Sequence, residues 1–311
     1  MDKLKKLPWR NIISAIVLVL FAVLVVRNWS DFVKSFDAIK NADKAWLAVA
    51  FAGMILTYIA AAGGYLVVSL KKLNALLTLL AQVAAAFANK LLPSGVGGLG
   101  LNVAFLHKNK YTPTEATTVT AVNSLAAFVS FSILFITALA MGGLQNSTLK
   151  LPKIPVWAVA LIVAVLVVAV VVVVKNKKIR AKIAELWHQV VTTVLAYKTQ
   201  PIKLFLAVVM ATCVTFAYLL ALYASARALG VHIGITEIFF VYVLGAIATA
   251  AVPTPGGLGA AEAALYAGFV SYGVPADQAL STVLAYRFIT YWVPILPGYL
   301  SFQYLQRQKM L

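Results

Sequence analysis

The feature that most constrains this chain is a series of apolar runs that reach about 18 residues or more. That is the length an α-helix needs to cross the roughly 30 Å hydrocarbon core of a bilayer. Backbone N–H and C=O groups find no water there, so only helices or closed barrels can span it. Of the 311 residues, 62% are hydrophobic and only 11% are charged, far less than in a soluble domain. The sequence therefore predicts an all-α polytopic membrane protein.

Six full spans and two broken apolar segments account for these runs. The first run follows a basic start, but Arg27-Asn-Trp-Ser30 offers no small-x-small cleavage site, so we predict a retained span rather than a signal peptide. The broken segments are expected at about 73–106 and 238–272. The full spans are expected at about 11–26, 45–70, 116–141, 156–174, 202–222 and 277–302, with Thr114 as N-cap of the third and with Pro294 and Pro297 interrupting the last.

Two related Pro-Gly motifs interrupt the broken segments. Residues 252–262 read Val-Pro-Thr-Pro-Gly-Gly-Leu-Gly-Ala-Ala-Glu, and residues 92–100 read Leu-Pro-Ser-Gly-Val-Gly-Gly-Leu-Gly. Proline stops a helix because it lacks an N–H donor, and glycine lets the backbone turn sharply. A broken helix is tolerated in a membrane where it lines a protein cavity. We interpret 92–100 and 252–259 as paired breaks of a transporter-like fold; close packing or simple bends is the alternative.

The distribution of basic residues predicts how the broken segments run. The net charge of +17 would indicate nucleic-acid binding in a soluble protein. Here the basic residues flank apolar runs, so contact with anionic lipid headgroups and orientation by the positive-inside rule explain them better. The basic N-terminus and the Lys175–Lys182 cluster are both predicted to be cytoplasmic. An even number of crossings must separate them, so segment 73–106 returns to the side it entered from. Counting the membrane crossings of the second half in the same way predicts that segment 237–272 enters from the outer side and returns to it.

The whole chain, residues 1–311, is predicted to form one membrane domain with an inverted repeat. Two re-entrant hairpins from opposite faces, added to six full spans, give halves at about 1–174 and 202–311. Residues 175–201 are predicted to form a basic amphipathic helix on the cytoplasmic surface, with a plain polar connector as the alternative. Both termini are expected on the cytoplasmic side of the cell (plasma) membrane, and a homo-oligomer is left open.

Three ionisable residues at membrane depth are the first candidates for a binding site, because such residues are expensive there. Two helix N-termini, at about Gly100 and Gly259, would point partial positive charge at the centre, which suits a phosphate. Lys90 or Arg287 would supply the full positive charge, and Glu262 would pair with Arg287 or contact an ammonium group. The predicted substrate-binding residues are Lys90, Gly97, Gly98, Asn102, Gly256, Gly257, Glu262 and Arg287.

Each of these residues also has a purely structural interpretation. A Glu262–Arg287 ion pair would hold the last span to the hairpin, and Lys90 would extend to an interface. Asn102 and Asn123 would hydrogen-bond between helices. The three histidines are scattered beside loops and the single cysteine lies in an apolar run, so the sequence predicts no catalytic site, no metal site and no cofactor.

The second break and the motifs after it carry a family resemblance. Residues 253–262 are followed by Gly273-Val-Pro, Ala279-Leu280, Tyr286-Arg287 and Tyr291-Trp292-Val-Pro294. This order resembles the C-terminal signature of the lysylphosphatidylglycerol synthase transmembrane family, the flippase-like domains of multiple-peptide-resistance factor proteins and of many stand-alone bacterial and archaeal proteins. The resemblance covers essentially the whole chain. Members commonly carry a Gly-Glu pair and an arginine near the first break, whereas residues 97–102 have neither, which makes Lys90 the candidate substitute.

The resemblance implies translocation of lipids between leaflets, with aminoacylated phosphatidylglycerol the best-known substrate. Full-length relatives add a soluble synthase domain, which this chain is expected to lack, so no aminoacyltransferase activity is predicted. The first hypothesis is therefore a flippase or transporter for an anionic or aminoacylated phospholipid, or a polyprenyl-phosphate lipid, with no nucleic-acid partner. The alternatives are a membrane enzyme or enzyme subunit that modifies a lipid or lipid-linked glycan, and a membrane scaffold.

Overall fold

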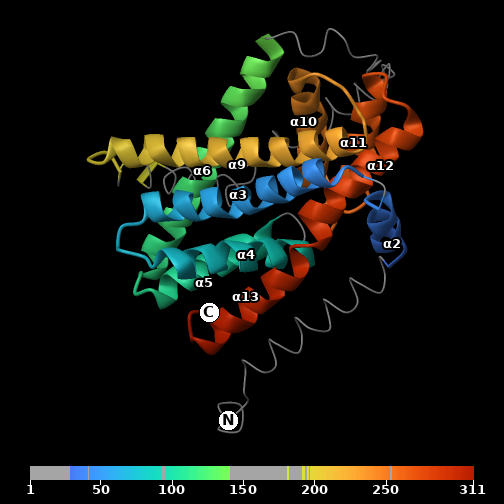
Figure 1. Ribbon diagram of the computed structural model, residues 1–311. Helices are drawn as coiled ribbons and strands as arrows, with labels where there is room; N and C mark the ends of the chain where they lie inside the picture. The colour runs from blue at the N-terminus through green and yellow to red at the C-terminus, as the bar shows by residue number, and fades with distance from the viewer. Residues whose placement is uncertain are drawn as a thin grey trace.

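The computed structural model describes residues 29–40, 42–92, 95–140, 181, 191–192, 195, 197–252 and 254–311, and this part of the chain is helical (Figure 1). The predicted spans at 11–26 and 156–174 and most of the 175–201 connector lie outside the described residues. The helices are α2 (Trp29–Ala38), α3 (Lys44–Val68), α4 (Ala75–Leu91), α5 (Val96–Lys108), α6 (Pro113–Ala140), α9 (Pro201–Ala228), α10 (Ile235–Ala251), α11 (Ala260–Ser271), α12 (Ala276–Arg287), a π-helix (Phe288–Trp292) and α13 (Ile295–Arg307).

Among the described residues, four segments are long and apolar enough to cross a membrane. They coincide with the four predicted full spans that fall on described residues, which confirms those spans as long apolar helices. α9 continues to Ala228 instead of ending near residue 222. α4 and α10 have 17 residues each, about 25 Å of helix at 1.5 Å per residue, which is short of a full crossing. The four long segments are Lys44–Val68, Pro113–Thr137, Pro201–Ala228 and Ala276–Arg307.

The start of α6 differs from the prediction, and Thr114 as its N-cap is wrong. Thr112 Oγ1 accepts the Glu115 N–H at 3.2 Å, and Glu115 Oε2 accepts the Thr112 N–H at 2.7 Å. This reciprocal pair is a capping box around a helix that begins at Pro113. Proline suits the first helical position because its missing N–H would be unpaired there anyway. The proline therefore moves the cap to the residue before it.

Replacing Thr112 with alanine is expected to destabilise the protein by about 1 kcal/mol, because it removes one capping hydrogen bond. Thr114→Ala is the matched control and should leave stability unchanged, since Thr114 lies inside the helix and is exposed. Equilibrium unfolding in mixed micelles measures both. Equal effects of the two substitutions would contradict Thr112 as the cap.

α3 and α9 lie side by side and antiparallel (Figure 1). At one end the Asp43 N–H donates to the Ala228 carbonyl at 2.8 Å, and at the other Lys203 Nζ donates to the Ser69 carbonyl at 2.8 Å. A Cβ on Gly53 would lie 2.9 Å from the Ala217 carbonyl oxygen, so glycine is needed for this close approach. The pair forms the centre on which the two helical hairpins are arranged.

The α4–α5 hairpin returns to the end of the molecule where it begins. Lys71, after α3, forms an ion pair with Glu115 of α6 at 2.8 Å, and the Tyr111 hydroxyl exchanges hydrogen bonds with the Lys71 backbone. The Tyr197 hydroxyl, near the start of α9, donates to the Val68 carbonyl at 2.6 Å. The ends of α3 and α5 and the starts of α6 and α9 therefore meet at one end.

The α10–α11 hairpin begins and ends at the opposite end. Val231 and Ile238, near its start, and Phe269 and Val274, near its finish, belong to one buried cluster. Residues 228–231 lie beside the start of α3, because Ala228 accepts the hydrogen bond from Asp43. Each hairpin thus returns to its own end of the α3–α9 pair. The re-entrant topology in a bilayer and the inverted repeat stay predictions.

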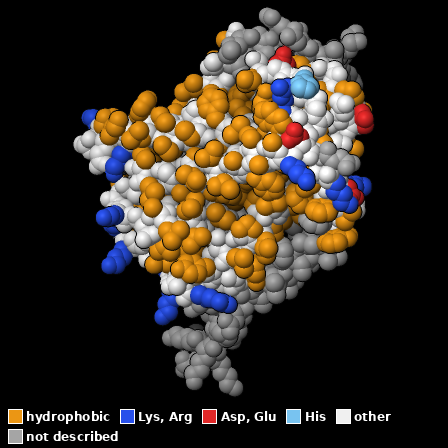
Figure 2. Space-filling model, in the orientation of Figure 1, with side chains coloured by type: hydrophobic (Ala, Val, Ile, Leu, Met, Phe, Trp, Pro, Cys, Tyr) orange, Lys and Arg blue, Asp and Glu red, His pale blue; other side chains and the backbone are white. Residues whose placement is uncertain are grey.

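The surface of the helices is strongly apolar. Hydrophobic side chains cover the middle of the face in Figure 2, and Lys and Arg gather along its left and lower edges. Large exposed side chains include Ile59 of α3, Phe128 of α6 and Phe205 of α9, which are 51%, 69% and 63% exposed. A soluble monomer rarely exposes so large an apolar area. Together with the four long apolar helices, this surface is that of a multi-pass membrane protein.

The last span is interrupted before Pro294, as predicted, whereas Pro297 lies in the first turn of α13 and interrupts nothing, so that part of the prediction is wrong. Pro294 cannot donate a backbone hydrogen bond, and just before it the Val293 N–H bonds to the Phe288 carbonyl at 2.9 Å, five residues back. The resulting π-helix, Phe288–Trp292, separates α12 from α13. Such π turns are frequent at functional sites because they reorient the side chains of one helical turn. Here the turn carries Thr290 and Tyr291.

Candidate functional site

The tips of the two hairpins border the same cavity. Gly95 precedes α5 with φ 72°, and Gly256 and Gly257 precede α11 with φ 59° and 71°, backbone conformations that favour glycine. All three line a cavity of about 340 Å³ together with Asn89 and Thr249. The two sequence breaks, far apart in the chain, therefore face each other. The break prolines at 93 and 253 lie outside the described residues.

The helix after the first break starts earlier than predicted. α5 begins at Val96, directly after Gly95, so a restart at about Gly100 is wrong. Gly95 is in the left-handed region directly before Val96, and the Asn89 side-chain oxygen accepts the Gly98 N–H at 2.5 Å. Asn89 thus supplies from α4 the cap that α5 lacks locally. α11 begins after Gly259, as predicted.

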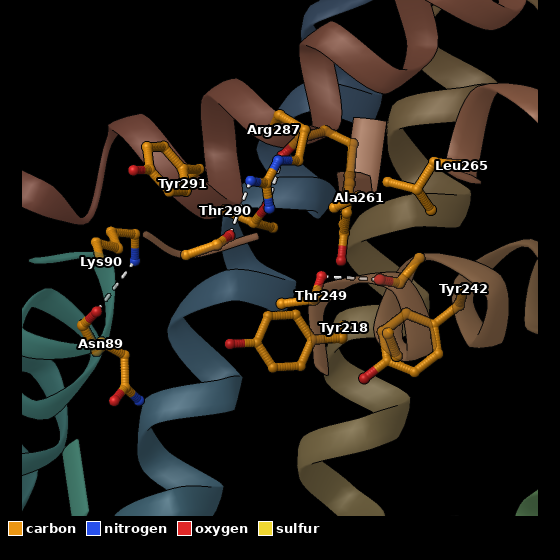
Figure 3. A pocket seen from close by; sticks show the side chains of 15 residues that line it. Asn89, Lys90, Tyr218, Tyr242, Thr249, Ala261, Leu265, Arg287, Thr290 and Tyr291 are labelled. Atoms are coloured by element: carbon orange, nitrogen blue, oxygen red, sulfur yellow. Dashed lines mark hydrogen bonds between the residues drawn. The ribbon is translucent and has the colours of Figure 1, made fainter. Parts of the chain in front are cut away.

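A second cavity, of about 330 Å³, lies beside the first between α4, α9, α10, α11 and the last span (Figure 3). We call it the central cavity. Its lining combines two cationic side chains with several hydroxyl groups and apolar walls. The polar and aromatic lining residues are Asn89, Lys90, Tyr218, Tyr242, Thr249, Tyr286, Arg287, Thr290 and Tyr291.

Arg287 is held by two partners at the edge of the central cavity. Its Nε donates to Glu262 Oε1 at 2.6 Å, and its Nη2 donates to the Gly256 carbonyl at 3.1 Å. Glu262 Oε2 in turn accepts the Gly259 N–H at 2.8 Å and so caps α11. The predicted pairing of Glu262 with Arg287 is therefore present. It joins the second break, α11 and the last span in one network.

Lys90 has no carboxylate partner among the described residues. Its side chain is only 7% exposed and lines the central cavity instead of extending to an interface. Its Nζ donates to the Ala86 carbonyl at 3.5 Å, a long contact. With Lys90 protonated, Lys90, Arg287 and Glu262 together leave one positive charge uncompensated. A buried charge without a partner is costly, and an anion bound in the cavity would offset that cost.

Tyr291 contacts both cations. Its ring centroid is 5.6 Å from Lys90 Nζ and 4.8 Å from Arg287 Cζ, within the range of cation–π attraction. Its hydroxyl is buried and has no hydrogen-bond partner among the described residues. The ring attracts both cations but carries no charge that would neutralise them.

A third cavity, of about 240 Å³, adjoins the central cavity; we call it the amide cavity. Gln82 Nε2 donates to Asn102 Oδ1 at 2.9 Å across α4 and α5. Asn102 therefore makes a hydrogen bond between two helices, as its structural interpretation predicted. Asn89 lines all three cavities and joins them.

The structure brings most of the predicted residues to the cavities, while their roles in binding stay predictions. Tyr218, Tyr242, Thr249 and Thr290 line the central cavity without being predicted, because hydroxyl groups in apolar helices give little signal in a sequence. Lys90, Gly256 and Arg287 line the central cavity, Gly257 the cavity between the tips, and Gly98 and Asn102 the amide cavity, whereas Gly97 packs against the Ala88 backbone and Glu262 holds Arg287.

Gly256→Ala is expected to destabilise the protein by about 1–3 kcal/mol. The new Cβ would lie 2.5 Å from Tyr291 Cε2, and φ is 59° at this position. Gly100→Ala is the matched control, since a Cβ there meets nothing within 4 Å, and alanine in a helix should be neutral or slightly stabilising. Unfolding of both variants in mixed micelles tests the difference. A Gly256→Ala protein as stable as the parent would contradict this packing.

Comparison with known proteins identifies the family of this chain. The model described as the lysylphosphatidylglycerol synthase TM region matches residues 11–298. The chain is 32% identical over 75 residues to a phosphatidylglycerol lysyltransferase of Staphylococcus haemolyticus (strain JCSC1435), covering 24% of this chain and 9% of that protein. It is 30% identical over 88 residues to the phosphatidylglycerol lysyltransferase of Staphylococcus aureus (strain MRSA252), covering 28% and 10%. The aligned stretches thus span at most a tenth of these relatives.

Proposed function

Because the chain belongs to the lysylphosphatidylglycerol synthase transmembrane family, we propose that it moves a lipid with a phosphate headgroup between the leaflets of the cell membrane. The two relatives are named for transfer of lysine to phosphatidylglycerol, a lipid with an anionic phosphodiester. The proposal concerns lipid movement alone.

The observation that carries the proposal is the uncompensated positive charge in the central cavity. A single phosphodiester brings one negative charge and oxygen acceptors. Lys90 has three N–H donors and uses one in a long contact with Ala86. Arg287 uses Nε and Nη2 in its two bonds, so its other N–H donors are left for a phosphate oxygen. Seating the phosphate would therefore neutralise the cavity without disturbing the Glu262–Arg287 pair.

The arrangement of the hairpins supports access from either side. α4 packs on α5 and α13, whereas α11 packs on α10 and α12. The central cavity lies between these two groups. A rocking movement of one group against the other, about the π-helix, would open the cavity first to one leaflet and then to the other. Alternating access of this kind is common in transporters built from re-entrant or broken helices.

Reconstitution in liposomes tests the proposal. Phosphatidylglycerol with a fluorescent label on an acyl chain is first distributed over both leaflets. A membrane-impermeant quencher is then added, and it quenches only the labelled lipid that is in, or moves to, the outer leaflet. We expect loss of the protected inner pool only in vesicles that contain the protein. Folded protein that moves none of several phosphate-headgroup lipids faster than empty vesicles would overturn the proposal.

A further inference from the structure

The amide cavity continues the central cavity on the side of α4 and α5. Ala86, Asn89 and Tyr218 line both. In Figure 3, the Asn89 amide lies below Lys90 and to the left of the Tyr218 ring. A headgroup whose phosphate contacts Lys90 and Arg287 would therefore have a second compartment within reach.

The polar groups of the amide cavity are uncharged and offer both donors and acceptors. The Gln82–Asn102 bond uses one amide N–H and one amide oxygen, which leaves Asn102 Nδ2 and Gln82 Oε1 unused in that bond. The Tyr58 hydroxyl is buried without a hydrogen-bond partner in the described part of the chain. Hydroxyl groups of a ligand match such a lining, since each donates and accepts. The polar residues are Thr57, Tyr58, Tyr65, Gln82, Asn89, Asn102, Asn123, Ser124 and Tyr218.

No carboxylate among the described residues lines any of the three cavities. The nearest acidic group in the network, Glu262, already accepts hydrogen bonds on both oxygens from Arg287 and Gly259. An ammonium group in the amide cavity would meet no counter-charge and would lie near the positive Lys90. Burial of an unpaired ammonium is costly, and a like charge nearby adds to the cost.

We propose that the site prefers a phosphodiester lipid whose headgroup ends in uncharged hydroxyl groups, such as glycerol or a sugar, over one that ends in an ammonium group. The phosphate lies at Lys90 and Arg287, and the hydroxyl groups lie in the amide cavity. This inference rests on the proposed function and makes it specific, because it distinguishes phosphatidylglycerol-like lipids from lysylated ones.

The test compares acyl-labelled phosphatidylglycerol, lysylphosphatidylglycerol and phosphatidylethanolamine in the liposome assay. We expect phosphatidylglycerol to move at least about tenfold faster than either ammonium lipid, the difference that 1.4 kcal/mol provides. Asn102→Asp should reduce this preference about tenfold, because it keeps the acceptor for Gln82 and adds a counter-charge for ammonium. Asn74→Asp is the matched control: Asn74 caps α4 through its side-chain oxygen, outside the cavities, and the preference should not change.

The outcomes separate this inference from the proposed function. If no lipid moves, the proposed function fails and the inference fails with it. If all three lipids move equally, or the ammonium lipids move faster, the inference is overturned while lipid movement stands. This comparison needs only the parent protein and so does not depend on folding of the Asp variant. Soluble glycerol phosphate that raises the thermal stability of the protein, without any lipid movement, would assign the site to a free organophosphate and overturn both.

Discussion

Replacing Lys90 with methionine is expected to increase stability while reducing lipid movement by about ten- to a hundredfold. The substitution removes a buried charge that has no carboxylate partner, and methionine fills a similar volume. The free-energy cost of burying that charge is therefore removed from the folded state. The same change removes a charged contact to the phosphate, worth on the order of 1.4–2.8 kcal/mol at these fold-changes. Unfolding in mixed micelles and the liposome assay give the two readouts.

Opposite signs of the two effects distinguish a binding residue from a structural one. Lys108→Met is the control, because Lys108 is an exposed residue in the last turn of α5 and its loss should change neither readout. A Lys90→Met protein that unfolds more easily and still moves lipid would assign Lys90 a packing role and remove the observation on which the proposed function depends.

Arg287→Ala is expected to reduce both stability and lipid movement. The Arg287 and Glu262 side chains are 11% and 23% exposed, so the substitution leaves a mostly buried carboxylate and the Gly256 carbonyl without a donor. Removal of one partner of a buried ion pair costs about 3–5 kcal/mol. Lipid movement should fall with it, because the second break and the last span are then no longer joined. Unfolding and lipid movement of the variant are measured as for Lys90.

Two further variants test whether Glu262 and Arg287 act through their ion pair or through contact with the substrate. Glu262→Gln removes the negative charge and keeps one of the two oxygen acceptors that bind Gly259 and Arg287, and it should cost less stability than Arg287→Ala. The double variant Arg287→Ala with Glu262→Ala should cost less than the two single alanine variants together, because the residues are in contact. Exposed Arg307→Ala is the control. Additive costs, or an unchanged stability of Arg287→Ala, would mean that the pair does not hold the hairpin.

The long apolar helices and the family could be recognised from the sequence because their signals are local. A run such as 45–70 must be a helix if it lies in a bilayer, since its backbone groups have no other partners there, and α3 spans Lys44–Val68. The order of motifs from residue 253 to Pro294 indicated the family, and the match over residues 11–298 confirms it.

Helix ends were less accurate, because one residue can change where a turn closes. Gly95 in the left-handed region starts α5 at Val96 rather than near Gly100, and Pro113 moves the cap of α6 to Thr112. Both residues were visible in the sequence. Their effect depends on the backbone angle that the surrounding contacts select, and for Gly95 those contacts include Asn89 on the preceding helix.

The sequence by itself determined that the chain is membrane-embedded and where its helices break, because the cost of unpaired backbone groups in lipid and the geometry of proline and glycine act on neighbouring residues. Only the tertiary structure decided that both breaks border one cavity and that Lys90 has no carboxylate partner among the described residues. Those facts depend on distances between residues far apart in the chain. Packing of α3 against α9, and of the hairpins around them, sets these distances, and no spacing along the sequence encodes them.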